Sequence, residues 1–421
     1  MNEATSLAPR ARGVFNQYRE MVVKHSIRRN PGESFAALPD AAAGWPIDDK
    51  VYDQFLSLVV DKAAFLKRID MVTGLDRLQG NILRDNMAGH ILKRTNVDDT
   101  VRRLPNIVGS GTGEQYNLLR AEFDARLKYD IIRHWAKKGP NFLAEQIRMA
   151  VSILFGNNLL NVGFQGLSDG DPPTGIADFA KGWLQLMRDN APANVMTEVV
   201  TGSGKIFIGG TKVANISGAA VSVAAGADTG LPAVNHGFKT GAYIFIDGTT
   251  NYDGWHLVLA SSTANQIDIL AAFTAENFSA PAKATQVADF RNMDELAVDL
   301  VSIVPVHKRS ELTCMVSDGL RAAEKALLYG SHGAQPSEKV VIERAFDNLA
   351  GYPVETPAFL PGNTLVATKH RNLSIYIHEN WNRAIENKHE WKGVVFWNEF
   401  TEGYFVEDPD SFVMAENIFR I

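Results

Sequence analysis

The stretch Pro140–Gly163, PNFLAEQIRMAVSILFGNNLLNVG, carries the longest uninterrupted helical pattern in the chain. Its apolar residues recur at intervals of three and four, which places them along one side of a helix. They are Leu143, Ile147, Ala150, Val151, Leu154 and Leu160, with a second row at Met149, Ile153 and Leu159. Two rows predict a helix that is covered on more than one side. Asn141 is the expected N-cap, and Gly163 is the expected left-handed stop.

A helix of roughly 22 residues is about 33 Å long, which approaches the thickness of a bilayer. The stretch nevertheless contains Glu145 and Arg148, and charges are costly inside a bilayer. We therefore expect a long helix of a water-soluble protein, with another part of the molecule lying along it. The first residues show no basic segment followed by an apolar run, so no signal peptide is expected.

Composition narrows the class of protein. The chain has 421 residues, enough for two or three domains, and its 45% hydrophobic and 21% charged residues exclude overall disorder. A net charge of −6 argues against a protein that coats nucleic acid with a basic surface. The single cysteine, Cys314, excludes an intramolecular disulfide and a cysteine-rich zinc site, and we expect it to be a small buried residue.

Two segments predict contacts with other molecules. Residues 1–30 contain six Lys and Arg residues against two Glu residues. This pattern is equally compatible with an arm that touches a partner chain or nucleic acid and with a solvated terminal helix. Residues 74–127 are polar and include a glycine-rich tip at 109–113. A stretch of this length without a core of its own predicts an extended hairpin that packs on another molecule.

Residues 201–288 differ from the rest of the chain. Only nine of these 88 residues are charged, and eleven are glycines. Six β-rich runs predict a separate all-β module, a small barrel or sandwich. They are Lys205–Ile208, Lys212–Ile216, Ala220–Val223, Ala242–Asp247, Trp255–Ala260 and Gln266–Leu270. Gly209-Gly210 is expected to form a hairpin turn between the first two runs.

The remaining segments alternate between helix and strand, which predicts α+β architecture with a mixed sheet. Helices are expected at Ala177–Asn190, at Asp318–Leu328 and around Met293–Ile303, and strands at Glu311–Val316, Leu365–Lys369 and Leu373–His378. Two further β-rich runs, Val394–Phe400 and Gly403–Glu407, are expected to flank a polar turn.

Three motifs resemble chemical sites without meeting their requirements. Gly166–Gly170 matches G-x-S-x-G, but a helix precedes Ser168 where a nucleophile elbow needs a strand. Gly202–Lys205 lacks the first glycine and the final Ser or Thr of a phosphate loop. Asp247–Gly254 lacks the closing glutamate of a calcium loop and is expected to be a hairpin turn. The ten histidines include no closely spaced pair. We therefore expect no enzyme, and no catalytic, cofactor-binding or metal-binding residues.

Several stretches, in this order and spacing, resemble the major capsid proteins of tailed bacteriophages, in their P-two-like (peduovirus-type) branch. The early stretches are Phe15–Tyr18, Phe65–Ile69, Gly182–Gln185, Arg188 and Ala191–Ala193. The more specific ones are Gly351–Pro353, Pro357–Phe359, Asn372–Tyr376 and Tyr404–Asp408.

The resemblance implies the Hong Kong 97 (HK97) capsid fold and assigns a place to each segment. Residues 1–73 would be the N-terminal arm, 74–127 the E-loop, and 128–200 the peripheral domain with a spine helix at 140–163. The inserted β module would be 201–288, which simple members of the family lack. Residues 289–385 would be the axial domain, and 386–421 would return to the peripheral domain.

The function implied is a major capsid protein that assembles as hexamers and pentamers into an icosahedral shell in the host bacterial cytoplasm. Expected partners are further copies of the chain, scaffolding and portal proteins, double-stranded DNA bound without sequence specificity, and a decoration protein on the β module. No membrane partner is expected. The alternative is a tail or baseplate protein whose module binds glycans through Tyr243, Phe245, Tyr252 and Trp255. Against this alternative, we expect these residues to form the module's own core, since Tyr243 and Phe245 share a strand face.

Overall fold

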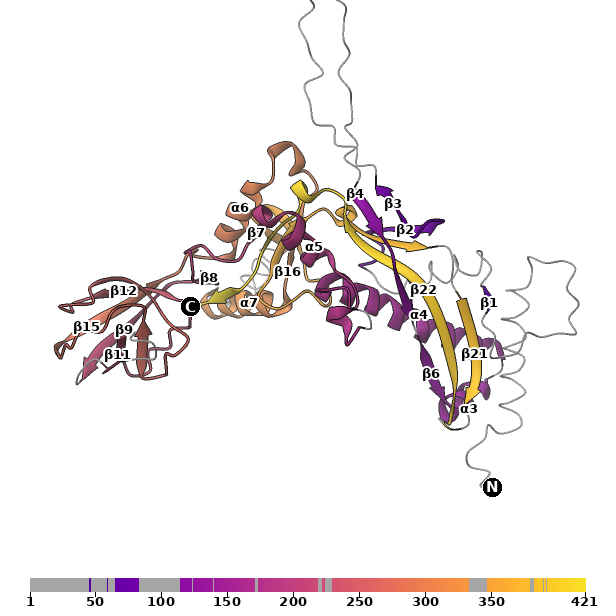
Figure 1. Cartoon of the computed structure of the whole chain (residues 1–421), viewed down its shortest axis with the longest axis horizontal. Coiled ribbons are helices and arrows are strands. Elements are labelled where there is room, and N and C mark those ends of the chain that lie inside the picture. The colour runs from indigo at the N-terminus through magenta and orange to yellow at the C-terminus, as the bar shows by residue number, and fades with distance from the viewer. Residues whose placement is uncertain are drawn as a thin grey trace, which may run out of the picture. The chain divides into compact units, whose positions relative to one another are not determined.

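In the computed structural model of the chain (Figure 1), two compact units are distinguished. The structure describes residues 45–46, 59, 65–82, 114–122, 124–138, 140–170, 173–218, 222–223, 229–332, 347–378, 382–388, 390 and 392–421. Unit 1 comprises 1–186 and 370–408, and unit 2 comprises 187–369 and 409–421. Among the helices of these described ranges, none is long and apolar enough to cross a membrane.

Unit 1 is a long helix packed on a mixed sheet. The helix is α4, Pro140–Gln165, and a shorter helix, α3 (Tyr129–Ala136), precedes it. The sheet contains seven described strands in the order β1-β21-β22-β20-β2, with β5 and β6 also paired to β22. The strands are β1 (Trp45–Pro46), β2 (Asp70–Leu75), β5 (Leu119–Glu122), β6 (Ala125–Lys128), β20 (Leu373–His378), β21 (Asn382–Lys388) and β22 (Gly393–Val406).

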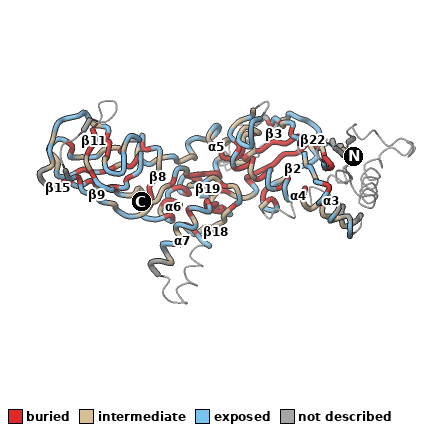
Figure 2. The backbone as a smooth tube through the Cα atoms, turned by 90° about the horizontal axis from the view of Figure 1, so that it is seen from below, coloured by how far each residue is buried: buried red, intermediate tan, exposed pale blue. Residues whose placement is uncertain are grey.

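The longest strand, β22, corrects one expectation. Thr401-Glu402-Gly403 does not form a turn, because β22 runs without interruption from Gly393 to Val406. Its central residues pair on both sides, Glu402 with Ile377 of β20 and with Leu119 of β5. Gly403 permits close packing here, since a Cβ at this position would lie 2.9 Å from Leu118. Buried residues accordingly follow most of this strand (Figure 2).

The end of α4 also differs from expectation. Gly163 does not stop the helix, which continues to Gln165, and its backbone is helical. Its role is steric: a Cβ on Gly163 would overlap the Trp183 ring, and a Cβ on Gly182 would overlap the carbonyl oxygens of Val162 and Gly163. The two glycines therefore allow α4 and the start of α5 (Trp183–Asn190) to approach closely. The predicted long helix itself is confirmed.

The helix expected at Ala177–Asn190 is shorter than predicted. A 3-10 turn, η2 (Ile176–Asp178), is followed by irregular chain until α5 begins at Trp183. The backbone groups of this segment bind the loop after α4 instead of one another. Leu167 N–H donates to Ala177 O at 2.7 Å, and Gly182 N–H donates to Gly166 O at 3.1 Å.

The expected extended hairpin at 74–127 is only partly separate from the body of unit 1. Strands β3 (Gln79–Ile82) and β4 (Glu114–Asn117) pair antiparallel, with Ile82 opposite Glu114. Residues 119–127, in contrast, belong to the body sheet through β5 and β6. Tyr116 and Leu118 are buried against Tyr376 in a small cluster. The glycine-rich tip at 109–113 lies outside the described residues.

Unit 2 contains a second mixed sheet, in the order β17-β18-β16-β19-β23-β7. Its strands are β17 (Asn348–Leu349), β18 (Tyr352–Glu355), β16 (Thr313–Val316), β19 (Leu365–Thr368), β23 (Val413–Ala415) and β7 (Val195–Met196). Helix α6 (Met293–Ile303) packs on this sheet, and α7 (Asp318–His332) follows β16. The Asn292 side chain caps the start of α6 by accepting a hydrogen bond from Glu295 N–H. Cys314 on β16 is fully buried, as expected.

The assignment of the C-terminal part needs correction. Strand β20 lies in the sheet of unit 1 although it was expected in the axial domain at 289–385. Residues 386–421 were expected to return to the peripheral domain, but the last part, 409–421, belongs to unit 2. There β23 pairs with β19 and β7, and β24 (Ile418–Arg420) pairs with β8 (Ile206–Ile208).

Residues 201–288 form β structure as predicted, with differences in detail. The further strands are β9 (Thr211–Gly218), β10 (Ser222–Val223), β11 (Thr229–Pro232), β12 (Tyr243–Asp247), β13 (Gly254–Leu257), β14 (Gln266–Ile269) and β15 (Phe278–Val287). They form two sheets, β13-β12-β15-β9 and β10-β11-β14, around one apolar core. Strands β11 and β15 were not predicted. Gly209-Gly210 is not a hairpin turn, because β8 pairs with β24 and β9 pairs with β15.

The two-stranded ribbon of β8 and β24 joins two apolar cores of unit 2. Ile206, Ile208 and Ile418 belong to the core beneath α6. Phe207 belongs to the core of the β module, and Phe419 packs against that core. Since successive side chains of a strand point to opposite faces, the ribbon contributes one face to each core. The β module is therefore joined to its neighbouring core by packing as well as by the covalent chain.

Replacing Gly163 with Ala tests the close approach of α4 and α5. Alanine favours helix over glycine, but the added methyl group overlaps the buried Trp183 ring. We expect a net loss of about 1–3 kcal/mol in the free energy of unfolding, measured by urea denaturation. The matched control is Gly175→Ala, because Gly175 has an extended backbone and no atom lies within 4 Å of the added Cβ. Equal stability of the two variants would contradict the packing argument.

Candidate functional site

One face of β22 carries an aromatic cluster that contacts α4 and α5. Phe400, Glu402 and Tyr404 alternate along the strand and therefore share a face. The Phe400 ring meets Phe155 of α4 edge-on, with centroids 4.9 Å apart. The Tyr404 ring meets Trp183 in the same way at 5.7 Å. Glu402 thus lies between two aromatic contacts, where an apolar residue would be expected.

Glu402 is a buried carboxylic acid with one oxygen left without a partner. Its exposed fraction is 1%. The hydroxyl of Tyr404 donates to Oε1 at 3.0 Å, whereas Oε2 has no hydrogen-bond partner. Burial raises the pKa of Glu402 to about 8, and the Tyr404 hydrogen bond only partly opposes this shift. The pKa of Tyr404 is raised in turn by burial and by the adjacent Glu402. At neutral pH, Glu402 is therefore mainly protonated.

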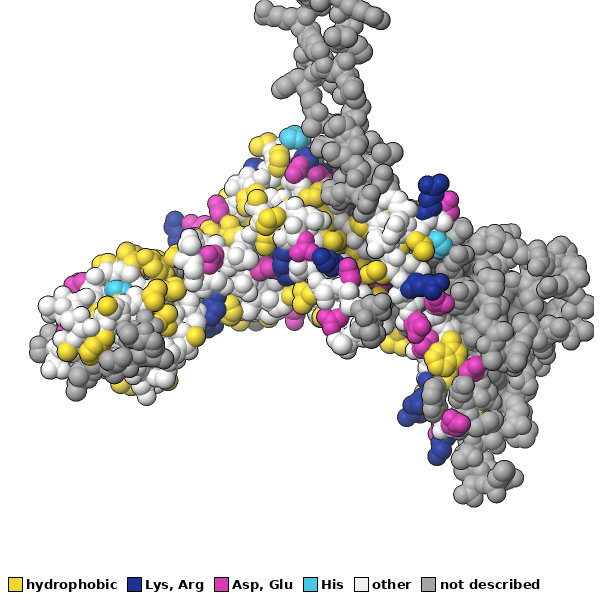
Figure 3. Space-filling model, in the orientation of Figure 1, with side chains coloured by type: hydrophobic (Ala, Val, Ile, Leu, Met, Phe, Trp, Pro, Cys, Tyr) yellow, Lys and Arg dark blue, Asp and Glu magenta, His cyan; other side chains and the backbone are white. Residues whose placement is uncertain are grey.

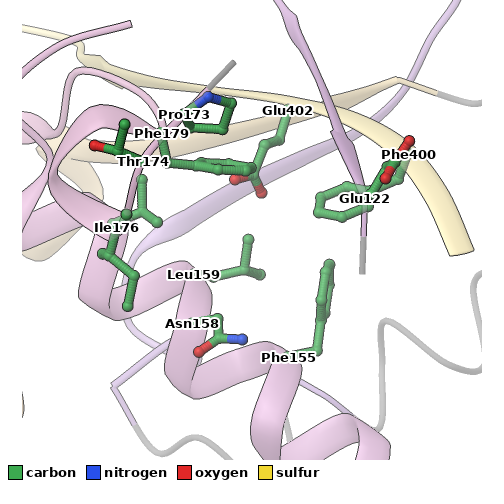
Figure 4. A pocket seen from close by; sticks show the side chains of 12 residues that line it. Glu122, Phe155, Asn158, Leu159, Pro173, Thr174, Ile176, Phe179, Phe400 and Glu402 are labelled. Atoms are coloured by element: carbon green, nitrogen blue, oxygen red, sulfur yellow. The ribbon is translucent and has the colours of Figure 1, made fainter. Parts of the chain in front are cut away.

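Glu402 is one of the residues that line a cavity of about 340 Å³ between α4, β22, β5 and the loop around η2. Most of its lining is apolar: Phe155, Leu159, Val162, Pro173, Gly175, Ile176, Phe179 and Phe400, with Glu122, Asn158, Thr174 and Glu402 as the polar residues. In Figure 4 the Glu402 side chain extends from β22 toward the space above Leu159. The rim is open to solvent, since Asn158 and Ile176 are exposed. The site is therefore a largely apolar enclosure with the buried Glu402 in its wall.

Sequence reasoning missed Glu402 because Thr-Glu-Gly is typical of a turn. A usable signal was nevertheless present. Phe400, Tyr404 and Val406 alternate with their neighbours in the period of a strand, and Glu402 occupies the same face. A strand that continues through 401–403 would have predicted a buried acid.

The stretches that resemble capsid proteins meet at the end of β22. Strands β20 and β22 pair with Ser374 opposite Phe405 and Ile375 opposite Tyr404. Trp183 Nε1–H donates to Ser374 O at 3.0 Å. The Glu407 carboxylate accepts from the hydroxyls of Ser374, at 2.5 Å, and Tyr376, at 2.9 Å. These stretches are thus parts of one packed junction.

A second junction of these stretches lies in unit 2. Arg188 Nε donates to Glu416 Oε2 at 3.0 Å, and its second guanidinium nitrogen binds the other carboxylate oxygen. Both partners are largely shielded from solvent. The pair joins the end of α5 to the chain just after β23.

The serine of the G-x-S-x-G motif lies in the loop after α4, so a helix precedes it as expected. Ser168 donates to Asp178 Oδ1 at 3.0 Å, and Thr174 also binds this carboxylate. These hydrogen bonds lower the pKa of Asp178. The serine closes the loop onto η2 and has no strand before it.

The glycine-rich turn before β8 binds a carboxylate of its own chain. The N–H groups of Gly202 and Gly204 donate to Glu198 at 3.0 and 2.6 Å. These backbone hydrogen bonds lower the pKa of Glu198. The groups that would bind a phosphate are therefore already satisfied, and the motif forms a turn that leads into β8.

The turn at 247–254 connects β12 and β13, as predicted. Asp253 Oδ1 accepts from the N–H and the hydroxyl of Thr249, both at 2.7 Å. Glu276 accepts from the N–H groups of Thr250 and Asn251, at 2.5 and 2.9 Å. Within the part of the chain that the structure describes, no group of three acidic, His or Cys side chains is arranged to hold a metal ion.

The four aromatic residues of the β module separate into two classes. Tyr252 is buried in the module's core. Trp255 and Phe245 are 49% and 38% exposed, and the Trp255 ring stacks on Tyr243 with centroids 5.1 Å apart and an interplanar angle of 7°. The expectation of a shared core is thus wrong for these three residues, which lie on the outer face of the sheet. Figure 3 shows hydrophobic side chains reaching the surface of this region.

Comparison with known proteins identifies the family. The sequence profile of the phage major capsid proteins of the P2 family matches residues 35–228 and 253–418. The chain belongs to this family.

Two relatives support the family assignment and the fold. The capsid protein of Escherichia phage P2 is 24% identical over 173 residues, which cover 39% of this chain and 47% of that protein. The matched segment thus spans about half the length of the relative. The satellite phage P4 procapsid, solved with its size determination (Sid) protein, contains a chain that superposes with a TM-score of 0.61 at 19% identity. The superposition covers 99% of both chains, and the fold is the HK97-type capsid fold.

The family match revises the extent of the insertion. Residues 201–228 and 253–288 align with the P2 family. The segment without a counterpart in that comparison is 229–252, which includes β11 and β12. The β module is therefore largely shared within the P2 family, although it was expected to set this chain apart from simple members of the wider family.

The pH dependence of the free energy of unfolding tests whether the pKa of the buried Glu402 is raised. The pKa of Glu402 is about 8 in the folded chain and near 4.5 in an unfolded one. Between these values the folded state binds more protons, so folding stability falls as pH rises, by up to about 1.4 kcal/mol per pH unit. Glu402→Gln should remove this contribution and stabilise the chain at pH 9 relative to the native sequence. The measurement is urea denaturation at pH 5, 7 and 9.

The matched control is Glu399→Gln on the same strand, since the Glu399 side chain is 40% accessible to solvent and lies 3.5 Å from Arg120. Its substitution should leave the slope of stability against pH unchanged. A native slope that survives in Glu402→Gln would contradict the assignment.

Proposed function

We propose that this chain is the major capsid protein of a tailed phage, which assembles as hexamers and pentamers into the icosahedral shell around the genome. The observation that carries the proposal is the family match over most of the chain, supported by the HK97-type fold. A shell subunit acts through many moderate contacts repeated by symmetry, so that closure and avidity take the place of single strong bonds.

Each segment has a proposed place in the shell. Unit 1, with α4 as the spine helix, corresponds to the peripheral domain, and the second sheet of unit 2 corresponds to the axial domain. Residues 1–73 act as the N-terminal arm. The E-loop is the segment that begins at β3 and ends at β4, and it lies over a neighbouring subunit. The antiparallel pairing of β3 with β4 supports a hairpin base at the correct position.

The proposed partners follow from the role of the chain as a shell subunit. They are further copies of the chain, scaffolding and portal proteins during assembly, and double-stranded DNA. Because the net charge of the chain is −6, the shell would hold DNA by enclosing it more than by electrostatic attraction. Assembly occurs in the host cytoplasm and the product is the virion capsid, without a membrane partner. The satellite phage P4 procapsid includes a size determination protein, which supports a role for auxiliary proteins in the assembly of this chain.

Removal of the E-loop tests the proposal. Because Ile82 and Glu114 are directly opposite each other, an Asn-Gly pair can replace residues 83–113 as a two-residue hairpin turn. We expect a folded protein with an unchanged urea midpoint that forms no closed shells under the electron microscope. The full chain, expressed with a scaffolding protein, should form closed shells.

Two results would contradict the proposal. Normal shells from the shortened chain would remove the E-loop from assembly. Tubes with a narrow lumen from the full chain would favour the tail-protein alternative.

The exposed aromatic face of the β module supports the remaining partner, a decoration protein. Tyr243 and Trp255 stack on each other, and the Phe245 ring meets Trp255 edge-on. The outer ring faces and the ring edges together form a partly exposed apolar patch, which a protein surface can cover. This patch supports a protein partner on the β module.

The double substitution Phe245→Ser and Trp255→Ser should leave shell formation intact and abolish cosedimentation of the decoration protein with shells. Retained cosedimentation would place that partner elsewhere. Binding of the native shells to a glycan array, lost in the double variant, would favour the glycan.

A further inference from the structure

One end of unit 1 carries a group of exposed basic side chains. Strand β6 exposes Arg126 and Lys128 on one face, because alternate residues of a strand point the same way. Lys128 lies opposite Gly393 of β22, and the N–H of Tyr129 donates to Lys392 O at 3.1 Å. The register of β6 with β22 thus places the exposed Lys392 next to Lys128 at the end of the sheet.

Helix α3 extends this group of cations. The helix begins directly after Lys128, and the exposed Lys137 and Lys138 follow its last residue. The Nζ atom of Lys138 lies 4.6 Å from the centroid of the Phe142 ring. The eight residues of α3 span about 12 Å, so basic groups lie at both ends of a short helix. Figure 3 shows Lys and Arg side chains at this end of unit 1, with acidic ones between them.

The charge of this region is opposite in sign to that of the whole chain. Residues 124–138 contain five Lys or Arg residues and two Asp residues, whereas the chain has a net charge of −6. The turn before β22 adds Lys392 and one acid, Glu390. Within the described ranges, four of the exposed cations form no ion pair, namely Arg126, Lys128, Lys137 and Lys392. The region therefore has an excess of positive charge that the described residues do not neutralise.

The helix dipole accounts for only part of this pattern. Lys137 and Lys138 follow the C-terminal end of α3, where the dipole favours cations. Asp130 lies in the first turn, where the dipole favours an acid. Lys128 directly precedes that turn, where the dipole disfavours a cation. A bound anion would remove this unfavourable interaction and pair the cations on β6.

The composition of this surface favours a nucleic acid over a protein as the anionic ligand. We call it the β6–α3 basic surface, and its side chains are Arg126, Lys128, Lys137, Lys138 and Lys392. Four of these five are lysines, and lysine is depleted in protein–protein interfaces. Phosphate backbones, in contrast, are bound by exposed Lys and Arg side chains without sequence specificity. A duplex presents roughly seven charges over the 12 Å or so that α3 spans, so phosphates lie within reach of both ends of the helix.

We propose that the β6–α3 basic surface binds the phosphate backbone of the packaged double-stranded DNA. The inference rests on the proposed function for the identity of the nucleic acid, but binding can be measured on the soluble subunit before any shell forms. Because the chain as a whole is acidic, the contact is local, and its affinity falls steeply as the salt concentration rises.

Fluorescence anisotropy of a labelled duplex of mixed sequence, titrated with the soluble full chain, tests the proposal. The measurement is the dissociation constant between about 50 and 200 mM salt. The test variant replaces four cations with Gln: Arg126, Lys128, Lys137 and Lys392. Its affinity at the lowest salt concentration should be about tenfold weaker or more, and its slope of log affinity against log salt should be flatter by about 3–4. A urea midpoint equal to that of the native chain verifies folding.

The matched control removes the same charge from unit 2, again as one Arg and three Lys replaced with Gln. Its four exposed positions are Lys239, Lys283, Arg291 and Lys325. This control should leave the salt slope close to that of the native chain. Equal losses in both variants would show an effect of net charge alone and overturn the proposal.

Electron microscopy of shells separates this inference from the proposed function. The test variant, expressed with a scaffolding protein, should still form closed shells. Unchanged DNA affinity together with a loss of shells would assign the β6–α3 basic surface to contacts between copies of the chain, and would overturn DNA binding. Closed shells from a native chain that shows no DNA binding would refute only this inference, whereas a native chain without shells would contradict the proposed function.

Discussion

The burial of the Trp183 indole is the constraint on which unit 1 depends. Its ring is fully buried, and its N–H donates to Ser374 O on β20. The same ring meets Phe164 at 5.1 Å and Tyr404 at 5.7 Å, so one side chain connects α4, β20 and β22. The ring fits because Gly163 has no Cβ. A buried indole needs a hydrogen-bond acceptor, and this requirement fixes the position of Trp183, at the start of α5, relative to the sheet.

Glu402 lies in the same layer of side chains, but its polar atoms are not all satisfied. The aromatic contacts beside it are satisfied, whereas one of its own oxygens is not. An apolar residue at this position would make the folded chain more stable at alkaline pH. Retention of an acid there is understandable if the free chain is not the final state. A shell protein passes from soluble subunit to assembly, and a polar atom that is unpaired in the first state can be paired in the second.

The sequence predicted the elements whose patterns are local and missed those set by partners distant in the chain. Helix α4 and strand β20 were predicted because apolar periodicity and length define them. The stop at Gly163 was wrong because the glycine serves the approach of Trp183, a residue 20 positions later. β15 was missed because its pattern reflects pairing with β9 and β12. Glu402 was placed in a turn because Thr-Glu-Gly is typical of one, although the strand period of Phe400, Tyr404 and Val406 continues across it. Tyr243 and Trp255 showed that strand position alone does not reveal which face is covered.

The ribbon of β8 and β24 has a consequence for synthesis on the ribosome. Strand β8 lies near the middle of the chain and β24 more than 200 residues later. The β module can close most of its own sheets as it emerges, but β8 remains without its neighbour until Ile418–Arg420 has left the exit tunnel. Until then, the nascent subunit exposes an unpaired apolar strand edge. The ribbon is thus completed only after more than 200 further residues have been synthesised, and chains truncated before Ile418 would retain the unpaired edge of β8.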